Sequence, residues 1–204
     1  MKHCRVHRSC RPRLRPAFTM VEAMVALCIT GVASSALLLT LTTATQSTDD
    51  AMNRFVAAGI MQTYMDEISG MRYMELGASP QESALVAGAD ETAATGRSIY
   101  DDIDDYNNIN ESPPRDKNGQ TLGNENGNTA VRDPVFCVPS TFMSRWRVNI
   151  DVFYVAENAW QTALADSAGT NYRTVQVRVT YTPAQGSSTE LSSQTRTFAY
   201  VPEP

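Results

Sequence analysis

The feature that most constrains this chain is an apolar stretch near its start, from Phe18 to Ala44, in which Glu22 is the single charged residue. As a helix, these 27 residues would span roughly 40 Å. That length exceeds the hydrocarbon core of a bilayer, which is about 30 Å thick. The 17 residues before the stretch carry six basic side chains and no acidic one. Because Lys and Arg resist translocation, we expect a cytoplasmic N-terminus and a body on the other side of the membrane.

The charge is divided unevenly along the 204 residues. All 22 acidic residues, but only 11 of the 17 basic ones, follow the first 17 positions. The net charge of −5 argues against a protein that binds nucleic acid by neutralising phosphates, so no nucleic-acid partner is expected. The length suits one domain of ordinary size.

Three interpretations of the apolar stretch compete. It is a secretory signal cut near Thr42–Ala44, or an uncut signal anchor, or a helix that is kept while the basic leader before it is removed. Glu22 separates them, because a carboxylate in hydrocarbon costs about 2.5–3.5 kcal/mol and such groups are usually paired and functional. An ordinary signal has no use for this charge. A position of Glu22 at the membrane surface is the alternative.

The residues RPAFTMVE, from Arg15 to Glu22, resemble the cleavage motif of type IV prepilins. In that family a basic leader ends in a small residue, and the mature chain starts with Phe and has Glu at its fifth position. The resemblance implies that residues 1–17 are a leader, that prepilin peptidase cuts after Ala17, and that Phe18 becomes N-methylated. The family prefers Gly where this chain has Ala17.

Charge pairing gives Glu22 a role in assembly. Cleavage would create a positive amine at Phe18, and the amine of a neighbouring subunit can neutralise Glu22 inside a bundle of helices that holds little water. Only one axial stagger between subunits brings the two charges together. We therefore expect residues 18–44 to be the transmembrane and filament-core half of the helix, with Glu22 setting the register.

The helical pattern continues past Asp49 and Asp50, which mark the expected exit from the bilayer. Apolar residues recur at spacings of three and four, with a predicted buried face of Phe55, Ala58, Met61 or Gln62, Met65 and Ile68. We predict one helix from about Thr19 to about Met74, with residues 45–76 as its amphipathic outer half. Its methionines are expected to form core and not a cofactor site.

Residues 77–133 are acidic, rich in Gly and Asn, and show no sustained period, which predicts a long loop with short embedded elements. Four aspartates in this loop are calcium candidates, because hard oxygen ligands suit that ion: Asp101, Asp102, Asp104 and Asp105. The spacing of an EF-hand is not matched. We therefore predict a solvated acidic loop and no metal.

A second resemblance rests on the same loop. The residues IYDDIDDY at 99–106 and SPPRD at 112–116 resemble the loop of the MshD-like minor pilins of mannose-sensitive haemagglutinin (MSHA) pilus systems. The resemblance implies a minor pilin, a structural subunit that enters a type IV pilus or its initiation or tip complex. Its implied partners are prepilin peptidase, the inner-membrane assembly platform, the major pilin, other minor pilins and membrane lipid. Its implied location is the inner membrane, by a single pass with a periplasmic body, and then the pilus.

Residues 134–204 predict an antiparallel sheet. Strand-like stretches run over 147–155, 172–182 and 189–201, the last of them polar as in an edge strand. A meander laid on the apolar face of the helix would bury both surfaces. The predicted class is therefore α+β, with the pilin-like arrangement of a long N-terminal helix whose outer half packs on a C-terminal sheet.

Chemistry-bearing residues are scarce in the predicted mature chain. Both histidines, His3 and His7, lie in the leader, and no zinc or phosphate-loop spacing occurs, so we expect no enzyme and no cofactor. Trp146 and Trp160 are expected to pack in the core. Two alternative functions stay open. One is a pseudopilin of type II secretion, and the other is a membrane-anchored extracytoplasmic module that binds calcium or another ligand.

Overall fold

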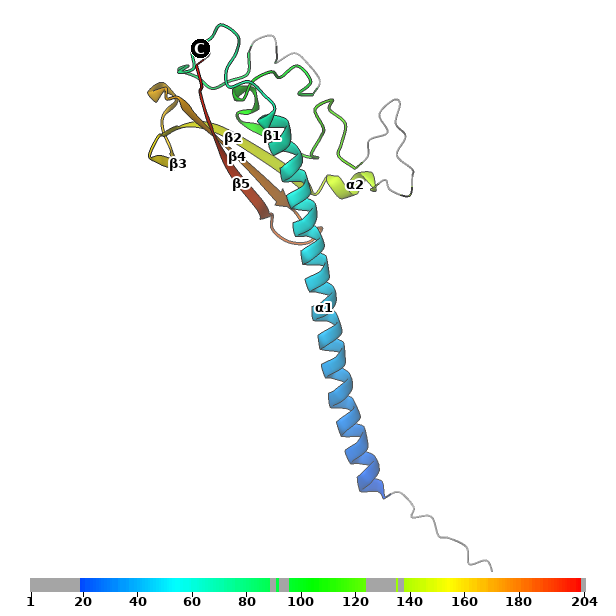
Figure 1. The fold of residues 1–204 in the computed structure, drawn as a ribbon. Helices are drawn as coiled ribbons and strands as arrows, with labels where there is room; N and C mark the ends of the chain where they lie inside the picture. Colours follow the sequence, from blue (N-terminus) through cyan, green and yellow to red (C-terminus); the bar gives the residue numbers. More distant parts are fainter. Residues whose placement is uncertain (1–18, 89–90, 92–95, 124–134, 136–137, 203–204) are drawn as a thin grey trace, which may run out of the picture. The chain divides into compact units, whose positions relative to one another are not determined.

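The computed structural model describes residues 19–88, 91, 96–123, 135 and 138–202. The chain divides into two compact units, Met1–Asp49 and Asp50–Pro204, so the division falls between the two aspartates expected at the bilayer exit. Helix α1 (Met20–Ser69) contributes its first 30 residues to the first unit and the rest to the second (Figure 1). The second unit also holds the strands, and the predicted α+β class is confirmed.

The sheet is antiparallel, in the order β1 (Ile109–Glu111), β2 (Trp146–Ala156), β4 (Tyr172–Tyr181) and β5 (Thr189–Ala199). Strand β3 (Ala159–Ala163) folds back on β2 outside this order. The described connections contain three short helical elements: η1 (Asp104–Tyr106), α2 (Ser140–Met143) and η3 (Asp166–Ala168). The three predicted strands correspond to β2, β4 and β5 to within two residues at each end, and β5 ends the strand order as an edge.

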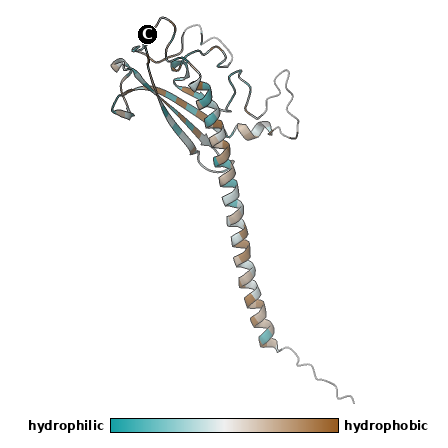
Figure 2. Cartoon of the chain, in the orientation of Figure 1, coloured by the Kyte–Doolittle hydropathy of each residue, from teal (hydrophilic) through white to brown (hydrophobic). Residues whose placement is uncertain are grey.

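Alternation along β2 and β4 explains the core. Every second residue of each strand points to one face. The middle of this face consists of buried valines and one isoleucine: Val148, Ile150, Val152, Val175, Val177 and Val179. The register pairs Ile150 with Val177 at the centre of this face. The same hydrophobic core contains the buried side of the outer half of α1. Figure 2 shows both hydrophobic and hydrophilic residues in this half of the helix.

The buried side of α1 differs from the predicted one. Phe55 is 83% exposed and Ala58 is exposed, whereas the side chains against the sheet are Ala57, Ile60, Tyr64, Met65 and Ile68. The prediction for Phe55 and Ala58 is therefore wrong. Tyr64 decides the face, because its hydroxyl donates to Glu111 at 2.6 Å and accepts from the backbone of Arg115 at 2.9 Å. These partners lie about 50 positions away and cannot be seen in helical spacing.

The end of α1 also differs, since the helix stops at Ser69 and not near Met74. Gly70 follows, and Arg72 forms a parallel bridge with Asp102. The Arg72 amide donates to the Asp101 carbonyl at 3.2 Å. The backbone after Ser69 is thus committed to the acidic segment, and this tertiary pairing replaces the last predicted turn of helix.

Candidate functional site

Glu22 lies in the first turn of α1 and closes a capping box with Thr19. The carboxylate accepts hydrogen bonds from the Thr19 amide at 3.2 Å and the Thr19 hydroxyl at 3.1 Å, and the Glu22 amide donates to the Thr19 hydroxyl at 3.2 Å. These reciprocal bonds satisfy amide groups that have no partner within the helix. We did not predict this local role from the sequence, although Thr-x-x-Glu before an apolar run is the signature of a capping box.

The two residues predicted for processing, Ala17 and Phe18, lie outside the described residues. The described chain begins at Thr19, next to the predicted cleavage site. The structure therefore describes the surroundings of Glu22, and the cleavage after Ala17 stays a prediction.

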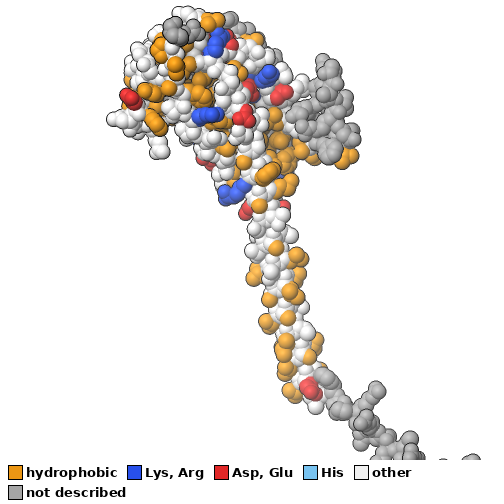
Figure 3. Space-filling model, in the orientation of Figure 1, with side chains coloured by type: hydrophobic (Ala, Val, Ile, Leu, Met, Phe, Trp, Pro, Cys, Tyr) orange, Lys and Arg blue, Asp and Glu red, His pale blue; other side chains and the backbone are white. Residues whose placement is uncertain are grey.

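Residues 20–44 of α1 are all exposed, including large aliphatic side chains such as Leu27, which is 72% exposed, and Val32, which is 71% exposed. Figure 3 shows hydrophobic side chains along this part of the helix. By length and hydropathy α1 is apolar enough to cross a membrane. An exposed apolar surface of this extent is typical of a membrane anchor or a signal sequence.

Most hydroxyl groups in this half of the helix are satisfied locally. Thr30, Thr40 and Thr43 each donate to the carbonyl four residues earlier, at distances of 2.8–2.9 Å. A threonine bonded in this way leaves no free donor facing an apolar surrounding. The polar residues of the stretch are thus compatible with lipid or with a dry bundle of helices.

The acidic segment is buried, and the predicted solvated loop is wrong. Asp102, Asp104 and Asp105 are at most 4% exposed. Asp102 accepts from the amides of Asp104 and Asp105, at 3.0 Å and 3.3 Å, and Asp105 accepts from the amides of Asp101 and Asp102. These contacts satisfy the carboxylates inside the fold, which makes the segment a structural element.

Arg173 on β4 holds the segment to the sheet. Its side chain is fully buried and donates to the carboxylate of Asp104 at 2.6 Å and to the hydroxyl of Tyr154 at 3.3 Å. Its guanidinium lies over the ring of Tyr73, 4.6 Å from the centroid. A buried arginine with these partners fixes η1 at one position on the sheet.

Carboxylate oxygens of Glu75, Glu91 and Asp101 lie within 4.8 Å of one another. Of the four predicted calcium candidates, only Asp101 belongs to this group. Asp101 forms an ion pair with Arg72, and burial raises the pKa of Glu91 to about 7. A guanidinium and a proton can thus offset two of the three negative charges without a metal ion.

Burial sets the pH response of this region. Burial, followed by the nearby carboxylates of Asp104 and Asp105, raises the pKa of Asp102 to about 8. An aspartate in an unfolded chain has a pKa of about 3.9, so folding favours the protonated form between these two values. Stability is therefore greatest at low pH in this window and falls as the pH rises through 8. We expect Tm to drop by several degrees from pH 5 to pH 9, since each kcal/mol is worth about 2–4 °C in a domain of this size.

The variant Asp102→Asn tests this assignment. The carboxamide oxygen can still accept from the amides of Asp104 and Asp105 but carries no charge, so Tm should be higher than that of the wild type at pH 9 and vary less with pH. Thermal melting followed by tryptophan fluorescence measures both. The exposed Asp166→Asn serves as the control and should follow the wild-type profile. An unchanged pH profile in Asp102→Asn would contradict the role of this group.

The two tryptophans have opposite environments. Trp146 is fully buried, as predicted, and packs on the ring of Tyr181 with 4.7 Å between centroids. Trp160 on β3 is 58% exposed, so the prediction that it packs in the core is wrong. Strand β3 pairs with the end of β2 through Ala156 and Ala159 and carries Trp160 away from the core.

When the chain was compared with family models, curated proteins and solved structures, none of them matched. Its function is therefore inferred from its own residues and their geometry.

Proposed function

We propose that this chain is a minor pilin of a type IV, MSHA-type pilus. The observation that carries the proposal is that one helix joins an exposed apolar half, with Glu22 in its first turn, to an outer half packed on an antiparallel sheet. The apolar half suits a membrane before assembly and a bundle of helices after it. In this proposal the protein is a structural subunit and not an enzyme. Its partners are the subunits and assembly proteins that the sequence resemblance implies.

The proposed route begins with insertion in the inner membrane, with the basic leader in the cytoplasm. Prepilin peptidase then cuts after Ala17, and the new amine of Phe18 becomes available to the Glu22 carboxylate of another subunit. In a water-poor bundle each charge offsets the desolvation cost of the other. The subunit leaves the membrane for the filament or for its initiation or tip complex.

N-terminal sequencing and mass spectrometry of the mature protein test this proposal. We expect a chain that starts at N-methylated Phe18 in cells with prepilin peptidase, and an uncut chain in cells without it. A chain that starts near Thr45 in both strains would identify a secretory signal, and one that starts at Met1 in both would identify a plain anchor or binding module. Co-purification with pili, and not with a secretion complex, distinguishes a minor pilin from a type II pseudopilin.

A further inference from the structure

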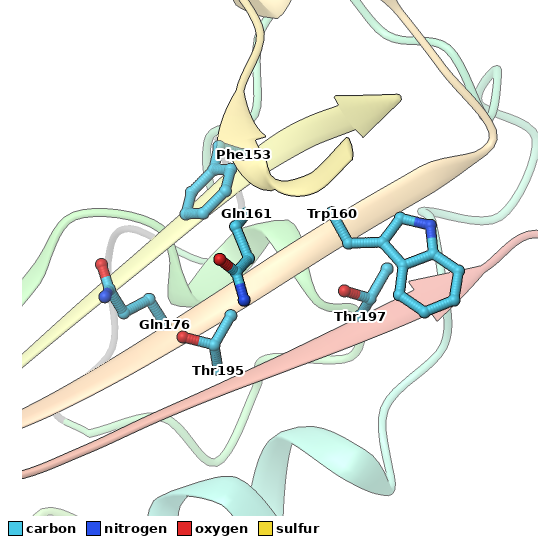
Figure 4. Close-up of a pocket in the computed structure, with 6 residues that line it drawn as sticks. All are labelled: Phe153, Trp160, Gln161, Gln176, Thr195 and Thr197. Atoms are coloured by element: carbon cyan, nitrogen blue, oxygen red, sulfur yellow. The ribbon is translucent and has the colours of Figure 1, made fainter. Parts of the chain in front are cut away.

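A hollow of about 430 Å³ lies on the face of the sheet that points away from the core (Figure 4). Its lining comes from four strands: Phe153 of β2, Trp160 and Gln161 of β3, Gln176 of β4, and Thr195 and Thr197 of β5. Gln176 alternates with the buried Val175 and Val177, which places the hollow on the opposite face from α1. We call this hollow the outer-face groove. Its volume lies in the range of about 300–1,000 Å³ that small-ligand sites occupy.

Trp160 gives the groove an apolar surface that the core does not use. More than half of this side chain is exposed, and the ring of Phe153 is half-buried in the same hollow. A large ring in a concave, otherwise polar site is typical of ligand contact, because a tryptophan offers wide apolar area at low entropic cost.

The polar lining is neutral. Two carboxamides and two hydroxyls provide its hydrogen-bonding groups, and no lining side chain carries a charge. Asp151 and Arg178, which lie on the same face, pair with each other. Because Gln and Thr side chains both donate and accept, the groove suits a ligand whose own groups do both. In Figure 4 the side chain of Gln161 points toward Thr195.

The groove is held in shape by a buried hydroxyl. Thr174 is fully buried; its hydroxyl donates to the carbonyl of Trp160 at 3.5 Å and lies 2.9 Å from the hydroxyl of Thr197. The Leu164 amide donates to the Tyr154 carbonyl at 2.8 Å, which fixes the far end of β3. Residues on both sides of the groove are thus positioned before a ligand arrives, which reduces the entropic cost of binding.

A second hollow of about 500 Å³ adjoins the first, because Trp160 and Gln161 line both. It continues along the turn between β2 and β3, past Glu157 and Asn158. The ring of Trp160 therefore stands between two spaces, and a chain-like ligand can occupy both while it contacts this ring.

We propose that the outer-face groove binds neutral oligosaccharides. Sugar hydroxyls donate and accept hydrogen bonds as the lining carboxamides and hydroxyls require, and the apolar C–H face of a sugar ring can lie on an indole. An anionic ligand would find no cationic side chain in the lining of either hollow, and the carboxylate of Glu157 lines only the second one. A purely apolar ligand would leave the polar groups of Gln161, Gln176 and Thr195 without hydrogen-bond partners. The neighbouring hollow extends the site beyond one ring, which favours an oligosaccharide over a monosaccharide.

A glycan array tests the proposal with the full-length protein in a detergent that has no sugar headgroup. The array carries neutral oligosaccharides of glucose, galactose, mannose and N-acetylglucosamine, with sialylated and sulfated ones as charged controls. We expect binding to neutral members and a change in tryptophan emission on binding, because Trp160 is exposed whereas Trp146 is buried. Trp160→Ala should weaken binding at least about tenfold, as loss of a stacking anchor does.

Matched variants separate binding from folding. Thr195→Val keeps the side-chain shape and removes the hydroxyl, so it should weaken binding while leaving Tm unchanged. Leu76→Ala removes an apolar side chain that is even more exposed than Trp160 but lies outside the groove, and it should bind like the wild type. Binding to no neutral oligosaccharide, binding only to charged ones, or equal binding by wild type and Trp160→Ala would overturn the proposal. A peptide array that bound through Trp160 while the glycan array stayed blank would assign the groove to a protein partner instead.

Discussion

Glu22→Ala should leave membrane insertion intact and reduce incorporation into pili by at least about tenfold. The proposed pairing places the Glu22 carboxylate against the Phe18 amine of another subunit, and removing one partner of a buried pair costs about 3–5 kcal/mol. A loss of 1.4 kcal/mol already corresponds to a factor of ten. The ratio of the protein in sheared pili to that in membranes, measured by immunoblot, gives the size of the effect.

The capping box requires a second variant, because Glu22 also bonds to Thr19 within its own helix. Glu22→Gln removes the charge but keeps a side chain that can close the box. Thr19→Ala does the opposite, since it removes the capping hydroxyl and keeps the carboxylate. Charge pairing predicts that Glu22→Gln fails like Glu22→Ala and that Thr19→Ala is incorporated. The reverse pattern would show that Glu22 serves only to start the helix.

Arg173→Met should lower the free energy of unfolding by about 3–5 kcal/mol. The substitution removes the guanidinium that reaches Asp104 and Tyr154 and leaves a carboxylate that is 3% exposed without its cation. Urea denaturation of the full-length protein, followed by tryptophan fluorescence, measures the change. Adding Asp104→Asn to the same chain should recover part of the loss, because the buried charge is then gone.

Arg178→Met is the matched control, on the same strand and with the same substitution. Arg178 pairs with Asp151, but each side chain of this pair is more than a third exposed. Such pairs contribute about 0–1 kcal/mol, so this variant should unfold close to the wild type. Equal losses in the two variants would mean that the acidic segment is not held by Arg173.

Local periodicity was sufficient for the strands and not for the helix face. In β2 and β4, alternation of period two leaves one set of apolar residues, and that set is buried. In the outer half of α1 two overlapping stripes exist. The stripe that contains Tyr64 packs against the sheet, because the Tyr64 hydroxyl donates a hydrogen bond to Glu111 on β1. The spacing of residues within the helix cannot predict a contact with a residue so far away in the sequence.

The acidic segment and Trp160 show the same limit for the candidate sites. A run of aspartates predicts a solvent-exposed segment unless a buried cationic side chain pairs with it. Here that side chain is Arg173, which lies 69 positions after Asp104. Trp160 has the composition of a core residue but lies on β3, whose fold back on β2 sets its exposure. By contrast, Glu22 stands out as the single charge in an apolar run, and the helix follows from the length of that run. Both signals are local in the sequence.

Within the described part of the chain, the hydrogen bonds that start α1 join Thr19 to Glu22 and Ala23. A peptidase that removes residues 1–17 would therefore leave the donors and acceptors of these hydrogen bonds in the chain. Maturation at that bond would shorten the polypeptide without unwinding its first turn, and the helix would enter its next surroundings already formed.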